Sequence, residues 1–262
     1  SQYGTDYYDI SDVEGKAITL TVDTPDSTSA IDAPAPSGEI FWYSNRADMS
    51  DTTLTRAFDL TDVSSAELEF KLWYFLEDQW DYGYVMVSTD DGATWTPLET
   101  PYTHAENPHN TAYGAGYTGI SSGASIAKWV VDRVSLDDYA GQEILIRFEM
   151  ITDDAINQPG MAIDDVRIDA INYFSDFESD DGGWQSAGWI RTDNRIPQQA
   201  WVQVIEQTRD GANVHRWLIP DDGRSFTFER DPGATQTFIA ISGIAPVTTV
   251  VMPYTITLTP AE

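Results

Sequence analysis

The 262-residue sequence contains no cysteine, which excludes disulfide bonds and cysteine-ligated zinc sites. Basic residues are also scarce. Fourteen Lys and Arg stand against 43 Asp and Glu, so the formal net charge is −29. Nucleic acids and anionic membrane surfaces are bound through clustered basic side chains, and we therefore expect neither as a partner.

Long apolar runs are missing as well. The apolar runs at 144–146 and 238–241 are far shorter than the roughly 20 residues that cross a bilayer, so no membrane insertion is expected. Disorder is nevertheless excluded, because hydrophobic residues make up 41% of the chain and aromatic residues 12%, enough to build a core. A chain of this length has room for one or two domains.

Recognisable catalytic motifs are absent too. Histidine occurs only at positions 104, 109 and 215, and no His-Glu-x-x-His segment is present to hold a catalytic zinc. There is also no Gly-x-Ser-x-Gly segment for a serine nucleophile. A carboxylate pair of the glycoside hydrolase kind stays open, because its spacing is three-dimensional. We predict no catalytic residue and no zinc in this chain.

The chain is instead rich in short runs of β-branched and aromatic residues, separated by Gly, Pro, Asn and Asp. This pattern predicts an all-β fold, since helical periodicity is almost absent. The predicted strands are 17–22, 40–44, 54–60, 66–76, 83–88, 94–98, 129–135, 143–151, 161–168, 201–206, 214–219, 225–228, 235–241 and 253–258.

Three parts are expected along the chain. Residues 1–37 hold one strand and a Pro/Ser-rich linker, residues 38–172 form a β-sandwich, and residues 173–262 form a small immunoglobulin-like β-sandwich. The glycine-rich loop 101–125 is long enough to be functional or mobile, although a plain connection between strands fits equally well.

One local motif is well defined. Residues 88–95, Ser-Thr-Asp-Asp-Gly-Ala-Thr-Trp, fit the Asp-box pattern Ser-x-Asp-x-Gly-x-Thr-Trp and resemble the boxes repeated in sialidases. We expect Gly92 to supply a positive φ, Asp90 to accept hydrogen bonds from the turn and Trp95 to pack beneath it. The motif therefore indicates a structural β-hairpin and says nothing about sialic acid.

Acidic residues gather near predicted strand ends and inside one strand. In a strand, neighbouring side chains point to opposite faces, so one of Asp164 and Asp165 should face the core, where an unpaired charge is costly. Calcium prefers such oxygen ligands and would neutralise the charge. Pairing with Arg46, Arg56 or Arg167 is the alternative. The predicted calcium ligands are drawn from Asp48, Asp51, Glu77, Asp81, Asp153, Asp164 and Asp165.

A series of separated segments then appears in a familiar order. The segments are Phe-Trp-Tyr-Ser-Asn-Arg at 41–46, Leu-Thr-Arg-Ala-Phe-Asp-Leu at 54–60, Phe-Lys-Leu-Trp-Tyr at 70–74, Asp-Tyr-Gly-Tyr-Val at 81–85, the Asp box, Tyr-Ala-Gly-Gln at 139–142 and Gly-Met-Ala-Ile-Asp-Asp-Val at 160–166. They resemble the region that follows the catalytic domain in immune inhibitor A-like bacterial metallopeptidases. Segments at 12–15, 182–184, 188–193 and 245–249 are similar to the flanking β-domains of these proteins.

The resemblance implies that residues 38–172 are a MAM-like jelly roll stabilised by calcium, with a catalytic peptidase domain in cis and a secreted, extracellular location. The zinc-binding helix of the family has no counterpart here, so no catalytic residue is carried over. Two functions follow as alternatives. The first is a non-catalytic accessory region that supports stability or recognises protein substrates or surfaces. The second is a carbohydrate-binding or adhesive module, in which Trp80, Tyr82, Tyr102, Tyr113 and Tyr117 would stack on sugar rings.

Overall fold

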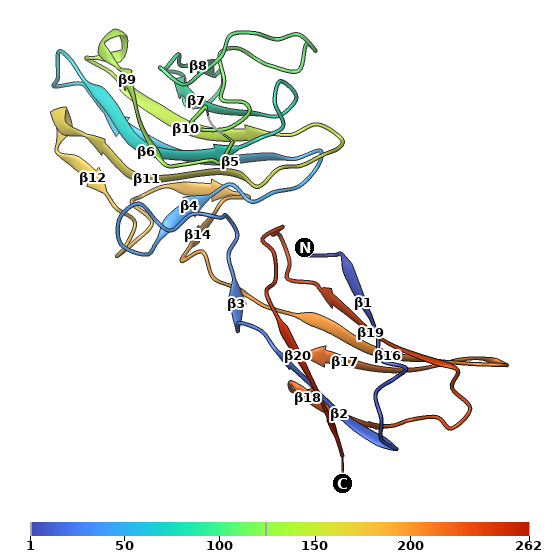
Figure 1. Ribbon diagram of the computed structural model, residues 1–262. Helices are drawn as coiled ribbons and strands as arrows, with labels where there is room; N and C mark the ends of the chain where they lie inside the picture. The colour runs from blue at the N-terminus through green and yellow to red at the C-terminus, as the bar shows by residue number, and fades with distance from the viewer. Residues whose placement is uncertain (1, 124, 262) are drawn as a thin grey trace. The chain divides into compact units, whose positions relative to one another are not determined.

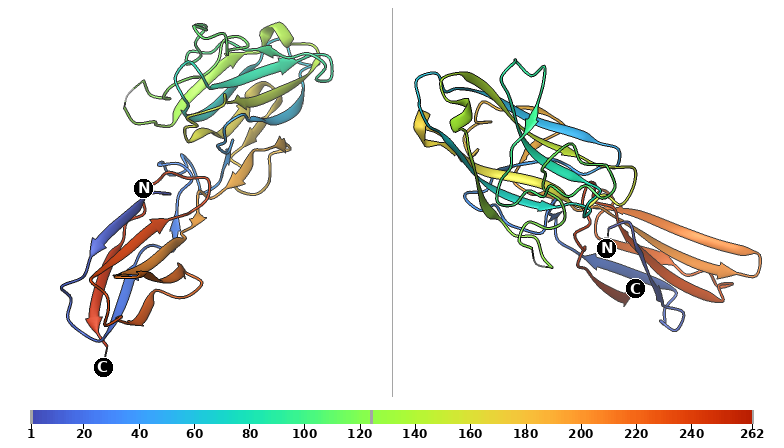
Figure 2. Two further views of the ribbon diagram at one scale, coloured as in Figure 1. Left: turned by 90° about the vertical axis from the view of Figure 1, so that its right-hand side faces the viewer. Right: turned by 90° about the horizontal axis from the view of Figure 1, so that it is seen from above.

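Strands and loops make up almost the whole chain in the computed structural model, which describes residues 2–123 and 125–261. The described residues contain no α-helix and only two short 3-10 turns, η1 (Asp137–Tyr139) and η2 (Asp169–Ile171) (Figure 2). The predicted all-β fold is therefore confirmed. No helix in this part of the chain is long and apolar enough to span a membrane.

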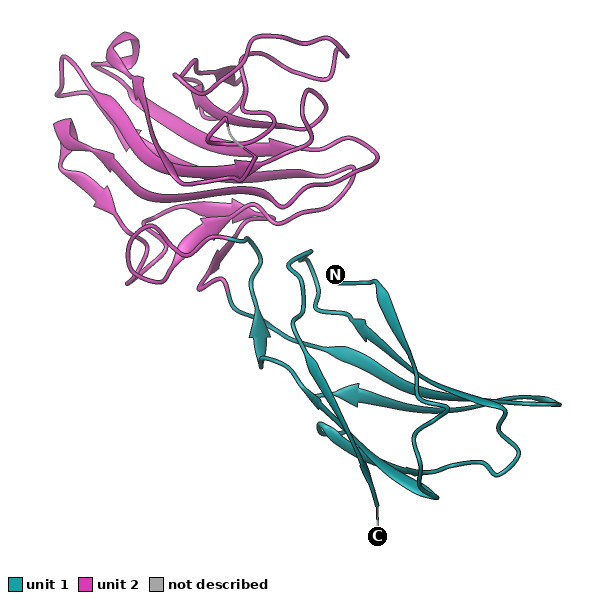
Figure 3. Cartoon of the chain, in the orientation of Figure 1, with its two compact units in different colours: residues 1–32, 195–262 teal, residues 33–194 magenta. Residues whose placement is uncertain are grey.

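The chain divides into two compact units (Figure 3). Unit 2 comprises residues 33–194, and unit 1 combines residues 1–32 with residues 195–262. This division differs from the expected parts 1–37, 38–172 and 173–262. The N-terminal strands belong to the same unit as the C-terminal strands because they pair with them, and the segment after residue 172 contributes further strands to unit 2.

Unit 2 contains two antiparallel sheets (Figure 1). One sheet has the order β13-β5-β10-β7-β8, and the other has the order β14-β4-β11-β6-β9, with β12 paired to β11. The bounds are β4 Phe41–Tyr43, β5 Asp51–Asp59, β6 Glu67–Phe75, β7 Tyr82–Ser88, β8 Thr96–Pro97, β9 Val130–Ser135, β10 Glu143–Ile151, β11 Gly160–Ile168, β12 Tyr173–Ser175, β13 Gln185–Ala187 and β14 Ile190–Thr192.

Alternation along the strands builds the core of this sandwich. In β10, Ile144, Ile146 and Phe148 are buried while the residues between them are partly exposed, as expected for a strand with one face on a core. The two sheets meet through aromatic contacts, and the rings of Phe70 in β6 and Phe148 in β10 have centroids 4.9 Å apart. Burial of these apolar faces stabilises the unit.

Unit 1 is built from a four-stranded sheet, β1-β19-β16-β17, a three-stranded sheet, β18-β2-β20, and the short pair β15-β3. Its own core includes Leu20, Val204, Phe226 and Ile239. The bounds are β1 Thr5–Asp9, β2 Ala17–Asp23, β3 Ser27–Thr28, β15 Ile196–Pro197, β16 Ala200–Thr208, β17 Gly211–Ile219, β18 Ser225–Glu229, β19 Gln236–Gly243 and β20 Thr255–Pro260.

All fourteen predicted strands overlap strands of the structure. The unpredicted strands are β1, β3, β12, β13, β14 and β15, of which all except β1 are only two or three residues long.

The turn at residues 88–95 is held by hydrogen bonds of its own side chains. Asp90 accepts from the Thr94 backbone N–H and from the Ser88 and Thr94 hydroxyls, and Gly92 has φ +83°. These hydrogen bonds lower the pKa of Asp90 to about 2.

The long loop between β8 and β9 is anchored to the sandwich. Tyr117 is completely buried and donates a 2.8 Å hydrogen bond to Asp132, whose carboxylate also accepts from Thr100. The backbone of the loop pairs with itself between His104 and Gly116 and with β7 at Gly83. Most of this loop is therefore held in place, and its exposed portion includes Tyr113.

Candidate metal centre

Three of the seven predicted calcium ligands lie at one end of unit 2. Strands β7 and β10 are antiparallel and pair Tyr82 with Ile151, so Asp81 just before β7 and Asp153 just after β10 emerge at the same end. Glu77 lies in the turn that carries the chain from β6 in one sheet to β7 in the other. The fold therefore brings together acids that are 76 residues apart in the chain.

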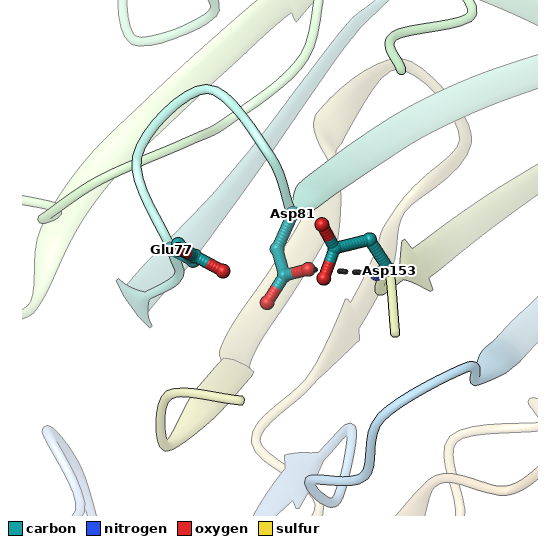
Figure 4. Close-up of side chains that lie close together, drawn as sticks. All are labelled: Glu77, Asp81 and Asp153. Carbon is teal, nitrogen blue, oxygen red and sulfur yellow. Dashed lines mark hydrogen bonds between the residues drawn. The ribbon is translucent and has the colours of Figure 1, made fainter. Parts of the chain in front are cut away.

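The turn from Glu77 to Asp81 is fixed by its backbone. The N–H groups of Trp80 and Asp81 donate to the Glu77 carbonyl oxygen at 3.3 and 3.1 Å, and Gln79 adopts a left-handed φ of 66°. Glu77, Asp81 and Asp153 each offer one carboxylate oxygen to a group whose members lie within 4.8 Å of one another. Figure 4 shows the three carboxylates pointing toward a common space.

Asp81 is the most constrained member of this group. It is 1% exposed, and its Oδ1 accepts a 2.9 Å hydrogen bond from the Asp153 backbone N–H. Its Oδ2 is buried and has no hydrogen-bonding partner among the described residues. Burial raises the pKa of Asp81 to about 6, and the nearby Asp153 and Glu77 charges act in the same direction. A buried carboxylate oxygen without a donor costs free energy unless a proton or a cation satisfies it.

Other carboxylates near Asp81 add negative charge to this group. Burial and the charges of Asp153 and Asp48 raise the pKa of Glu77. Asp48 is exposed, and its Oδ1 accepts from the backbone and side-chain N–H groups of Asn157 at 3.1 and 2.7 Å. Asp48 therefore contributes to the field at the group without being one of its three members.

Asp51 lies elsewhere. It begins β5, and burial and the charge of Asp51 raise the pKa of Glu149 in β10. The structure thus places Asp51 in a second acidic pair, which sequence reasoning missed. The available signal was Glu149 in β10, which is flanked by the apolar residues Phe148 and Met150.

Asp164 and Asp165 form a third acidic group, which lies in β11. The ladder between β11 and β6 shifts register after Asp164, and Asp165 has a φ of +48°. Asp164 is completely buried and accepts from the Asp165 backbone N–H at 2.7 Å, while Lys71 Nζ lies 2.6 Å from Asp165 Oδ2. The cation beside this pair is therefore a lysine of the neighbouring strand.

The three arginines considered as partners have contacts of other kinds. Arg46 Nε donates to the Asn157 side chain, Arg56 lies over the Tyr173 ring at 4.2 Å, and Arg167 pairs with Glu69 at 3.7 Å. The sequence analysis missed Lys71 as the cation beside Asp165, because its position follows only from the pairing of Lys71 in β6 with Asp164 in β11.

The aromatic residues proposed for sugar stacking are divided. Tyr82 and Tyr117 are buried in the fold, whereas Tyr113 is 72% and Trp80 39% exposed. Trp80 stacks on His109 with ring centroids 3.9 Å apart and 9° between the planes. One face of Trp80 is thus already occupied within the chain.

Unit 2 is thus an all-β sandwich with an acidic group at one end of its sheets. Residues 8–194 match the family model of the immune inhibitor A-like MAM domain, which covers most of the chain, and the chain belongs to this family. The resemblance noted in the sequence is therefore confirmed.

Three relatives illustrate the similarity. The chain is 28% identical over 132 residues to pre-pro-metalloprotease PrtV of Vibrio cholerae serotype O1, 29% identical over 160 residues to immune inhibitor A of Bacillus thuringiensis subsp. alesti, and 29% identical over 124 residues to bacillopeptidase F of Bacillus subtilis. The alignments cover 50%, 60% and 47% of this chain. They cover only 13%, 21% and 7% of the relatives, so the chain spans a small part of their length.

Proposed function

We propose that this chain is a non-catalytic accessory region of a secreted, extracellular zinc metallopeptidase of the immune inhibitor A type, with the catalytic domain in cis. The observation that carries this proposal is the family match over residues 8–194. Two of the similar proteins are named as a metalloprotease and as immune inhibitor A, which supports the same context. The accessory region would support stability and recognise polypeptide substrates or surfaces.

We further propose that calcium binds at Glu77, Asp81 and Asp153. The buried Oδ2 of Asp81 supports a cation there, because it needs a partner and none of the described residues supplies one. An all-oxygen set of carboxylates suits a hard cation, and calcium accepts the irregular geometry that loops provide. Asp48 would strengthen the field around the ion.

Purified chain is expected to hydrolyse no casein, with or without added zinc. The three histidines are at positions 104, 109 and 215, and none belongs to the acidic group. The measurement is release of soluble peptides from labelled casein after repeated purification. Activity that survives purification and disappears in His104→Ala or His109→Ala would contradict the non-catalytic role.

Calcium titration is expected to change the fluorescence of Trp80. Trp80 lies between Glu77 and Asp81 in the sequence of the proposed calcium turn, and its ring stacks on His109. An ion that draws the two carboxylates together should therefore alter the surroundings of the ring. The measurement is emission intensity against calcium concentration. Trp80→Phe is the control and should lose the change while the other eight tryptophans remain. An identical response in this variant would contradict the placement of the ion.

A further inference from the structure

A second feature of unit 2 is an open groove on the outer face of the β5-β10-β7 sheet, with a volume of about 900 Å³. Arg147, Glu149 and Ile151 alternate along β10 and line the groove, whereas Phe148 and Met150 between them face the core. The groove is therefore a feature of the sheet surface, distinct from the space between the two sheets.

Large apolar side chains line this groove. Met49 is 81% exposed and Tyr113 is 72% exposed, and both line it. Trp95 lies partly buried on the same surface, with the Arg147 guanidinium 3.7 Å from its ring centroid. Large apolar side chains grouped around a concavity are characteristic of binding sites.

The lining of the groove is also acidic. The lining contains four carboxylates and one cation, Arg147. Asp153 belongs to the proposed calcium group, so in calcium the negative charge that faces a ligand comes from Asp51, Glu149 and Asp154. Arg147 Nη1 lies 3.6 Å from Glu149 Oε2. Asp51 lies close enough to Glu149 for its charge to raise the pKa of Glu149, and Arg147 is the one cation beside these two acids among the described lining residues.

The contacts of Arg147 indicate that this surface can bind a cationic side chain. Its guanidinium stacks on an aromatic ring and faces a carboxylate, which are the two ways in which proteins hold arginine. A second cation arriving from outside would meet the remaining carboxylate charge, and its aliphatic stem would cover Met49 or Tyr113. Anionic ligands are repelled by the same charge, and neutral ligands gain nothing from it.

We infer that this groove binds a Lys or Arg side chain of an extended polypeptide, with the cation at Asp51 and Glu149 and apolar neighbours of the peptide against Met49 and Tyr113. The inference deepens the recognition role proposed above and rests on it for the choice of a polypeptide. The groove would then act as a docking site for basic segments of protein substrates.

The test is fluorescence anisotropy of a labelled decapeptide of Arg, Leu and Gly, titrated with the full chain in calcium. A peptide with citrulline in place of Arg is the matched probe, since it keeps the shape and removes the charge. Arg peptide should bind at least about tenfold more tightly than citrulline peptide, and the difference should shrink as ionic strength rises.

Variants locate the binding. Glu149→Gln and Tyr113→Ala should each weaken binding of the Arg peptide by about tenfold. Asp138→Asn changes the net charge as much as Glu149→Gln at an exposed position in η1, outside the groove, and should change affinity less than about twofold. Tyr113→Ala removes an exposed side chain, so it remains informative if Glu149→Gln fails to fold.

Three results would overturn the inference. Equal binding of the Arg and citrulline peptides would remove the role of charge. An equal loss of affinity for the Arg peptide in Asp138→Asn and Glu149→Gln would show that the peptide responds to the overall charge of the chain and not to the groove. Binding of cellohexaose that Tyr113→Ala abolishes, without peptide binding, would assign the groove to carbohydrate. None of these results depends on the casein assay, so failure of the groove and failure of the non-catalytic role are separable.

Discussion

Removing calcium with a chelator is expected to lower the melting temperature of the chain by about 5–10 °C, relative to calcium at about a hundred times its Kd. An ion that binds only the folded state at this excess contributes about 2.7 kcal/mol to the free energy of unfolding. The affected transition should belong to unit 2, which contains Glu77, Asp81 and Asp153. Magnesium should restore the melting temperature poorly, because it demands a smaller octahedral site.

Asp81→Asn should reverse the order of stability between the two conditions. With chelator, the variant should melt at or above the wild-type temperature, because a neutral amide avoids burying a charge at a position that is 1% exposed. With calcium, the variant should melt lower, because it has lost a ligand. Differential scanning calorimetry of both proteins in both solutions measures this reversal.

Asp164→Asn is the matched control for the same experiment. It also removes a buried carboxylate, but from a place outside the Glu77–Asp81–Asp153 group. The difference between its melting temperatures with calcium and with chelator should equal that of the wild-type protein. A wild-type midpoint that is unmoved by chelation would contradict the calcium site, and an equal loss in both variants would show that it is not at Asp81.

The longer strands could be predicted from the sequence because their burial is periodic. In β6 and β10, apolar residues at alternate positions face the core, and this pattern can be read without knowing the partners. Short edge strands such as β13 and β14 could not be read in this way. Their residues are mostly exposed, and they are strands only because β5 and β4 offer free edges.

The acidic residues show where sequence reasoning ends. Proximity of Asp81 and Asp153 follows from the pairing of β7 with β10, and the sequence gives no direct sign of that pairing. The buried Asp in β11 was expected from side-chain alternation, but the bulge after Asp164 and the lysine opposite it depend on the register with β6. Acidic residues that look alike in the sequence therefore lie in three different surroundings.

Asp164 should make the stability of unit 2 depend on pH. Burial, and secondarily the adjacent Asp165 charge, raise the pKa of Asp164 from 3.8 to about 7 in the folded chain. Between these values the folded state binds a proton that the unfolded state has lost, so the free energy of unfolding falls as pH rises through this window. The contribution is present at low pH and is lost above about pH 7, with a magnitude of up to about 4 kcal/mol.

The local hydrogen bonds fit a protonated Asp164. The Ser37 hydroxyl has one proton and lies 2.7 Å from Asp165 Oδ1 but 3.3 Å from Asp164 Oδ2. With the Ser37 proton directed to Asp165, a proton on Asp164 Oδ2 has the Ser37 oxygen as its acceptor. Lys71 then neutralises Asp165, its partner at 2.6 Å, and the pair carries one negative charge in place of two.

Asp164→Asn is accordingly expected to be more stable than the wild type by about 1–2 kcal/mol near pH 5 and by about 4 kcal/mol near pH 8, because the amide has no proton to lose. Urea unfolding at both pH values in saturating calcium measures the two differences and keeps Asp81 from contributing. Asp165→Asn removes a neighbouring charge that raises the pKa of Asp164, so in this variant the loss of stability should be complete at a lower pH than in the wild type. A difference between Asp164→Asn and wild type that stays constant across pH would mean that Asp164 titrates at its ordinary pKa, and the lysine would then have to balance two charges in this bulge.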